Sequence, residues 1–216
     1  MKKLIIAAAI LAISLASAAQ SPEVIKAGDI LDRVSAKTKS YTSIKAEFSF
    51  TMENLQIQES DTYEGSILIK GNKYKASVMG ADTYFDGKTM WMHLKDANEV
   101  NISDADMMDD ESLDPASIFT IYEKDFRYMH AGETKINGKV ADIIDLFPEA
   151  RDKSFSRIKL FIYRDNLHFA KIIQIGKDGN NYIIDIKKME TNIPADDTMF
   201  VFDSTKHPGV EVIDLR

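Results

Sequence analysis

The 216-residue chain contains no cysteine, and this absence removes three classes of protein. A disulfide-stapled domain, a thiol enzyme and a cysteine-ligated zinc site all need thiols. Glycine and proline are scarce, at 10 and 5 residues, which excludes a collagen-like or low-complexity chain. A formal net charge of -7 disfavours nonspecific nucleic-acid binding, because that binding needs cations that neutralise phosphates. What remains is a globular chain with 44% apolar residues, too apolar to be disordered.

Long apolar runs are also missing, with one exception at the N-terminus. Lys2 and Lys3 precede an unbroken apolar run that ends at Ile13, and small residues follow as far as Ala19. This order is typical of a cleaved secretory signal, and the run is shorter than the roughly 18–20 apolar residues of a membrane span. We therefore expect residues 1–19 to be a signal peptide rather than an anchor, residues 20–216 to form a single domain, and the product to be exported to the periplasm as a soluble protein.

The first element after the signal is predicted to be a helix that runs from Pro22 to about Lys39. Ser21 is a suitable N-cap, and proline is favoured at the first helical position. Apolar residues such as Leu31 and Val34 then recur at helical spacing.

Most of the remaining chain has the pattern of short strands. They are predicted at 44–52, 63–70, 73–79, 83–86, 89–94, 99–102, 126–134, 140–147, 157–163, 168–176, 182–189 and 199–202. Turn dipeptides such as Asn137-Gly138 separate several of them. Eleven or twelve short strands joined by hairpins predict an antiparallel sheet. The exception is 103–124, where Asp114-Pro115 opens a predicted short helix.

Several of these strands are apolar on both faces. Consecutive apolar residues occur at Ile67–Ile69, Met90–Met92, Leu160–Tyr163 and Ile172–Ile173. Because a sheet with one wet face should alternate cleanly, something must cover the second face of these strands. Two short helices are available for this, so we expect a strongly curved sheet with a partly filled apolar concavity.

No arrangement of residues indicates catalysis or metal binding. The acidic run at 104–111 lacks the glycine and the final glutamate of a calcium loop. His93, His130, His168 and His207 are scattered, and no nucleophile elbow or phosphate-binding loop is present. We expect no enzyme activity, no catalytic residue, no metal and no cofactor. The 10 methionines, 11 phenylalanines and 8 tyrosines instead favour an apolar ligand cavity.

Several segments, taken in chain order, resemble the periplasmic lipoprotein carrier family LolA. They are Lys45-Ala46-Glu47-Phe48-Ser49-Phe50, Glu64-Gly65-Ser66-Ile67-Leu68-Ile69-Lys70, Phe85-Asp86-Gly87-Lys88-Thr89-Met90-Trp91, Asp114-Pro115-Ala116-Ser117-Ile118-Phe119, Phe200-Val201-Phe202 and His207-Pro208-Gly209-Val210-Glu211-Val212-Ile213. The fourth is similar to the Pro-led lid helix of that family, and the last two are similar to its C-terminal end.

The resemblance implies a mainly β fold, an incomplete antiparallel β-barrel of about eleven strands with helices covering its mouth as a lid. An apolar cavity would hold the acyl chains of lipoproteins. Such a carrier takes acylated lipoproteins from an inner-membrane ABC transporter and passes them to an outer-membrane acceptor. It implies a monomer, and the absence of cysteine favours the soluble carrier over the membrane-anchored acceptor LolB, which shares the fold.

Eight residues are the predicted lining of this cavity: Phe48, Phe50, Ile67, Ile69, Tyr74, Trp91, Ile118 and Phe119. Proteobacterial members of the family place an arginine after the strand that ends here at Lys70, where it latches the lid. This chain has Gly71-Asn72 and then Lys73, and lysine cannot reproduce the planar fork of a guanidinium. Two alternatives remain open, a sensor of the same fold that binds lipid or a misfolded envelope protein without transporting it, and a secreted hydrolase.

Overall fold

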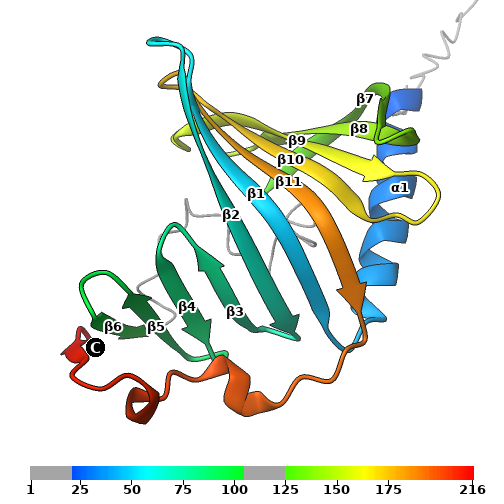
Figure 1. Cartoon of the computed structure of the whole chain (residues 1–216). Coiled ribbons are helices and arrows are strands. Elements are labelled where there is room, and N and C mark those ends of the chain that lie inside the picture. The colour runs from blue at the N-terminus through cyan, green and yellow to red at the C-terminus, as the bar shows by residue number, and fades with distance from the viewer. Residues whose placement is uncertain (1–20, 105–124) are drawn as a thin grey trace, which may run out of the picture.

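The computed structural model describes residues 21–104 and 125–216, and the strands of these residues form a single sheet of twelve (Figure 1). In chain order the elements are α1 (Pro22–Lys39), β1 (Ile44–Asn54), β2 (Glu59–Lys70), β3 (Lys73–Val78), β4 (Ala81–Phe85), β5 (Thr89–Leu94), β6 (Glu99–Asp104), β7 (Phe126–Ile136), β8 (Lys139–Pro148), β9 (Phe155–Tyr163), β10 (Phe169–Gly176), β11 (Asn180–Thr191), the 3-10 turns η3 (Asp197–Phe200) and η4 (Ser204–Lys206), and β12 (Glu211–Asp214).

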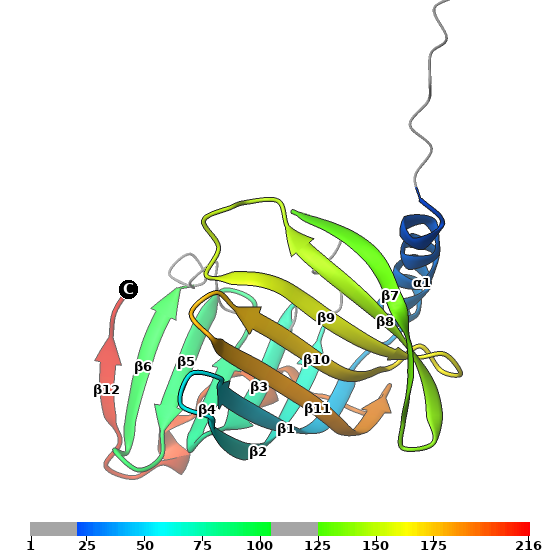
Figure 2. The ribbon, with the colours of Figure 1, turned by 90° about the horizontal axis from the view of Figure 1, so that it is seen from above.

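The strands are ordered β12-β6-β5-β4-β3-β2-β1-β11-β10-β9-β8-β7 across the sheet. Every neighbouring pair is antiparallel except β12 and β6, which run parallel. Figure 2 shows the strands following a curved path from β12 round to β7, and these two edge strands do not pair with each other. The predicted mainly β fold with an open antiparallel sheet is confirmed, although the strands of the described residues number twelve and not eleven.

The strand predicted at 199–202 is wrong. Residues Asp197–Phe200 form a 3-10 turn, and the side chain of Asp196 caps it by accepting hydrogen bonds from the backbone N–H and the hydroxyl of Thr198. Short polar side chains that bond to nearby backbone compete with strand pairing, which explains the error. The twelfth strand is instead Glu211–Asp214, added in parallel to the edge of β6.

Helix α1 has the predicted bounds. Ser21 caps it with a 3.4 Å hydrogen bond from the backbone N–H of Val24, and Pro22 occupies its first turn. Its buried side chains, among them Ala27, Leu31 and Val34, pack on strands β8 to β10 in the main hydrophobic cluster. The helix therefore covers one part of the sheet rather than the mouth of a barrel.

Three predictions fall outside the described residues: the signal peptide at 1–19, the acidic run beyond Asp104, and the lid helix that begins at Asp114-Pro115. Of the two helices predicted to form a lid, only α1 lies in the part of the chain that the structure describes, and it packs on the sheet instead of covering a mouth.

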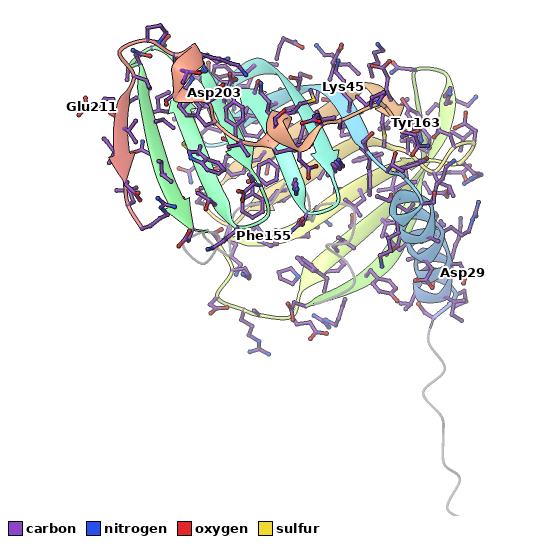
Figure 3. All side chains as sticks on the ribbon, turned by 90° about the horizontal axis from the view of Figure 1, so that it is seen from below. Asp29, Lys45, Phe155, Tyr163, Asp203 and Glu211 are labelled. Atoms are coloured by element: carbon purple, nitrogen blue, oxygen red, sulfur yellow. The ribbon has the colours of Figure 1, made fainter. Side chains whose placement is uncertain are left out.

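Residues 193–210 return across the opposite face of the sheet and lead to the edge strand β12. Figure 3 shows the segment at Asp203 running over the strands of the β3–β6 half, before Glu211 begins the edge strand β12. Phe200 is fully buried, and Phe202 packs with Tyr84 and Val100 in a separate cluster. We call the face that contacts α1 the inner face and the face under residues 193–210 the outer face.

Candidate functional site

The inner face carries a row of apolar side chains across six strands. Directly paired residues of neighbouring antiparallel strands project from the same side of a sheet. The pairs that begin at β2 and continue to β8 form what we call the Phe50 row: Tyr63, Phe50, Ile184, Ile172, Leu160 and Ile144.

The burial of this row changes along its length. Ile144 and Leu160 are fully buried and Ile172 is nearly so, because they lie in the cluster that α1 covers. Phe50 and Ile184 are only half-buried. No helix among the described residues packs on this part of the row, so apolar side chains remain accessible there.

A second group of buried residues lies on the inner face at β1 to β4. Ile44, Ile69, Tyr74 and Phe85 form its core. The accessible apolar surface lies between this group and the α1-covered cluster. We call it the central strip, and its half-buried members are Phe48, Phe50, Ile67, Ile184 and Ile186.

Five of the eight predicted lining residues share the inner face. Phe48, Phe50 and Ile67 belong to the central strip. Ile69 and Tyr74 pair directly with each other at its end and are 5% and 2% exposed. The structure therefore brings these five together, three as accessible side chains and two as buried support.

Trp91 does not join them, because it lies on the outer face. It pairs with Tyr84 on β4 and with Ile102 on β6, and it packs on the cluster that contains Phe202. Its neighbour Met90 is the residue of β5 that contacts the inner group. The other two predicted residues, Ile118 and Phe119, lie outside the described residues.

The ring of Phe48 lies directly over the backbone of Gly65, its partner in the register. A Cβ atom added to Gly65 would lie 2.6 Å from both Cε2 and Cζ of Phe48, closer than real contacts allow. Glycine therefore makes room for a flat aromatic ring on the strip.

Ile184, Ile186 and Tyr182 are inner-face residues that the sequence prediction missed. In β11 the apolar spacing changes from two to three between Ile186 and Met189, which breaks the strand pattern. A β-bulge opposite Glu47 and Phe48 accommodates the one residue by which β11 is longer than its partner here. The side chains of Ile186 and Met189 therefore both face the inner side of the sheet. The alternation of Tyr182, Ile184 and Ile186 was the available signal, but only the pairing with β1 shows that they continue the same surface.

An ion cluster joins α1 to the β7–β9 edge of the inner face. The guanidinium of Arg164 donates two hydrogen bonds to the Asp142 carboxylate, at 3.0 and 2.7 Å. His130 Nε2 lies 2.9 Å from the same carboxylate, and Lys26 of α1 lies 3.6 Å from it. Chiefly through the bonds from Arg164, and secondarily through His130, the pKa of Asp142 falls from 3.8 to about 2.

The lysines on either side of the turn where the resemblance places an arginine hold the C-terminal segment. Lys70 and Lys73 both donate to the carboxylate of Asp197, at 2.8 and 2.7 Å. These two hydrogen bonds lower the pKa of Asp197 to about 2. Lys75 instead lies over the ring of Tyr84, 4.7 Å from its centroid. In the described part of the chain, these cations therefore serve the outer face.

Two of the histidines that are far apart in sequence meet on the outer face. The rings of His93 and His207 have centroids 4.4 Å apart, and both pack on Phe202. Among the described residues, no group of three or more histidines and carboxylates could hold a metal ion. The same residues include no helix with the length and hydropathy that crossing a bilayer requires.

Comparison with known proteins points to one family. The model of the family described as outer membrane lipoprotein carrier protein LolA matches residues 15–164, more than half of the chain. No curated protein matches the sequence.

Solved structures extend the likeness in fold. An uncharacterized conserved protein from Thermus thermophilus has a TM-score of 0.59 and 13% identity, over 88% of this chain and 99% of that one. A LolA superfamily protein from Nitrosomonas europaea has a TM-score of 0.46 and 13% identity, over 82% and 98% of the two chains. LprF from Mycobacterium bovis has a TM-score of 0.48 and 14% identity, over 81% and 96%. At these identities the comparison bears on the fold alone, and only the first score is high enough to support it.

Proposed function

Because this chain belongs to the outer membrane lipoprotein carrier family LolA, we propose that it is a periplasmic carrier that binds the acyl chains of lipoproteins and moves them from the inner to the outer membrane. The observation that supports this most directly is the central strip, whose aromatic and branched aliphatic side chains stay half-buried between two fully buried clusters. We propose Phe48, Phe50, Ile67, Ile184 and Ile186 as the side chains that contact the acyl chains, with Ile69 and Tyr74 as their support.

The physical reason for such a surface is the cost of exposing an acyl chain to water. Each methylene that leaves a membrane loses about 0.8 kcal/mol of hydrophobic stabilisation, so a lipoprotein with several chains needs an apolar surface to accept them. A surface that is only partly covered can receive them without first unfolding a packed core. Binding, rather than catalysis, is therefore the proposed activity, and no cofactor is needed.

The proposed partners follow from the direction of transport. Acylated lipoproteins would be received from an inner-membrane ABC transporter and delivered to an outer-membrane acceptor. The net charge of -7 suits a protein that must leave anionic membrane surfaces after each delivery, because like charges repel.

The test is release of lipoproteins from spheroplasts by the protein purified from the periplasm. We expect the wild-type protein to release acylated lipoprotein into the supernatant and to co-purify with it. Phe48→Glu places a charge on the strip and should abolish release. Thr51→Glu is the matched control, because Thr51 lies on the same strand but pairs with Ile183 and Thr62 on the outer face, and this variant should retain release.

Equal release by Phe48→Glu and wild type, with both proteins folded by circular dichroism, would rule out the strip as the binding surface. Binding of a synthetic tri-acylated peptide without any release from spheroplasts would replace the carrier by a lipid-binding sensor of the same fold.

A further inference from the structure

Gln174 of β10 is a polar residue in an apolar part of the inner face. Its partners in the register are Ile158 on β9 and Tyr182 on β11, and Ile172 precedes it by two residues on the same side. Only 8% of Gln174 is exposed. Within residues 21–104 and 125–216 its amide makes no hydrogen bond.

Tyr182 adds a second polar group beside this amide. Its ring stacks on Phe50 of the central strip, with centroids 6.3 Å apart and an interplanar angle of 8°. Tyr182 is half-buried, and its hydroxyl has no hydrogen-bond partner in the part of the chain that the structure describes. Among the described residues, neither polar group belongs to the fully buried side-chain atoms that lack a hydrogen bond, so both reach accessible space beside the strip. Two adjacent hydrogen-bonding groups without a protein partner in the described residues, next to an accessible apolar strip, indicate a polar part of the ligand.

The charge of the surrounding row limits what that polar part can be. The row that contains Gln174 crosses seven strands as Tyr128, Leu146, Ile158, Gln174, Tyr182, Met52 and Asp61. It includes one carboxylate and no cation. A fatty-acid carboxylate or a phosphate would be recognised by a lysine or an arginine, whereas a neutral carbonyl needs only hydrogen-bond donors. The amide N–H groups of Gln174 and the hydroxyl of Tyr182 are such donors.

We propose that Gln174 and Tyr182 bind the carbonyl oxygen of the ester or amide that joins an acyl chain to its polar head, and so select neutral acyl esters and amides over free fatty acids. The acyl chain then extends from the Gln174 row across the Phe50 row to Phe48 and Ile186. This assignment rests on the proposed function, because it places the linkage of the acyl group at one end of the strip. It also sets the direction in which the cargo lies on the sheet.

The test measures displacement of a fluorescent apolar reporter, N-phenyl-1-naphthylamine, by three ligands of equal chain length: methyl palmitate, palmitate and hexadecane. The variants are Gln174→Leu, which keeps the volume and removes the amide, and Tyr182→Phe, which removes only the hydroxyl. We expect wild type to prefer methyl palmitate to palmitate. Gln174→Leu should weaken the binding of methyl palmitate about tenfold, and Tyr182→Phe should weaken it severalfold, because each variant loses a single hydrogen bond. The affinity of both variants for hexadecane should stay within about twofold of wild type.

A spectroscopic signature separates a hydrogen bond from a change of packing. The carbonyl stretch of bound methyl palmitate should lie at lower frequency in wild type than in Gln174→Leu. Equal weakening of the ester and of hexadecane, or an unchanged carbonyl stretch, would overturn the proposal while leaving the strip as an acyl site. Failure of all three ligands to displace the reporter from wild type would overturn the proposed function itself.

Discussion

The two halves of the inner face are built from the same residue types but differ in what covers them. On β8 to β10, leucine and isoleucine side chains lie under α1 and are excluded from solvent. On β1, β2 and β11, phenylalanine and isoleucine side chains of the same rows are half-buried. Within the Phe50 row, an apolar side chain is therefore buried where α1 covers it and half-buried where α1 does not, although the residue types are similar.

The largest predicted effect contrasts the two ends of the Phe50 row. Leu160→Ala removes a fully buried side chain from under α1 and should lower the free energy of unfolding by about 2–5 kcal/mol. Phe50→Ala removes a half-buried side chain from the same row and should cost less than about 2 kcal/mol. Urea denaturation measures both, and displacement of N-phenyl-1-naphthylamine by methyl palmitate should be impaired by Phe50→Ala and retained by Leu160→Ala. If Phe50→Ala destabilised the protein more than Leu160→Ala, the division into a covered half and an accessible half would be wrong.

The second prediction concerns the ion cluster that ties α1 to the covered half. Because the pKa of Asp142 is lower in the folded protein than its ordinary value of 3.8, its ionised form stabilises the fold above about pH 4. This stabilisation is lost as the pH falls from about 4 to about 2 and amounts to about 2 kcal/mol. Asp142→Asn should be less stable at pH 7 by a similar amount, and its stability should change less between these two pH values.

Thermal unfolding at pH 7, 4 and 2 measures this effect. Asp165→Asn is the control, because Asp165 pairs with Lys139 at an exposed site and contributes little. Equal acid sensitivity of Asp142→Asn and wild type would place the acid-labile contact elsewhere.

The third prediction tests whether Gly65 is needed by the ring of Phe48. Gly65→Ala would bring a methyl group against that ring and should destabilise the protein by about 1–2 kcal/mol, although alanine normally favours a strand more than glycine does. Combining it with Phe48→Leu, which removes the ring atoms that clash, should recover part of the loss. Purely additive losses in the double variant, measured by urea denaturation, would refute the contact.

Sequence reasoning succeeded where local chemistry decides the outcome. The bounds of α1 follow from Ser21 and Pro22, and the turn at Asn137-Gly138 joins β7 to β8 with both residues at positive φ, as that dipeptide favours. The alternation in β1 also placed Phe48 and Phe50 on one face.

It failed where the outcome depends on partners that are distant in the chain. Met90 and Trp91 are both large and apolar, and only the pairing of β5 with β4 and β6 assigns one to each face. The bulge that keeps Ile186 and Met189 on the inner face cannot be predicted from β11 alone, because it exists only in the register with β1. The amide of Gln174 likewise becomes significant only once its neighbours are known.

The smallest predicted effect lies on the outer face. It tests whether the two faces are independent, because the inner face should keep its binding. Asp197→Ala removes the carboxylate that Lys70 and Lys73 share, an exposed contact that salt screens. Residues 193–216 should then be cut faster by a protease at low ionic strength, while binding of methyl palmitate stays equal to wild type. Because Phe200 and Phe202 still anchor the segment in apolar contacts, the increase should be modest and should vanish in high salt, where the wild-type ion pairs are screened as well. A loss of acyl binding in Asp197→Ala would instead mean that the segment on the outer face controls the inner one, and the division between the two faces would have to be abandoned.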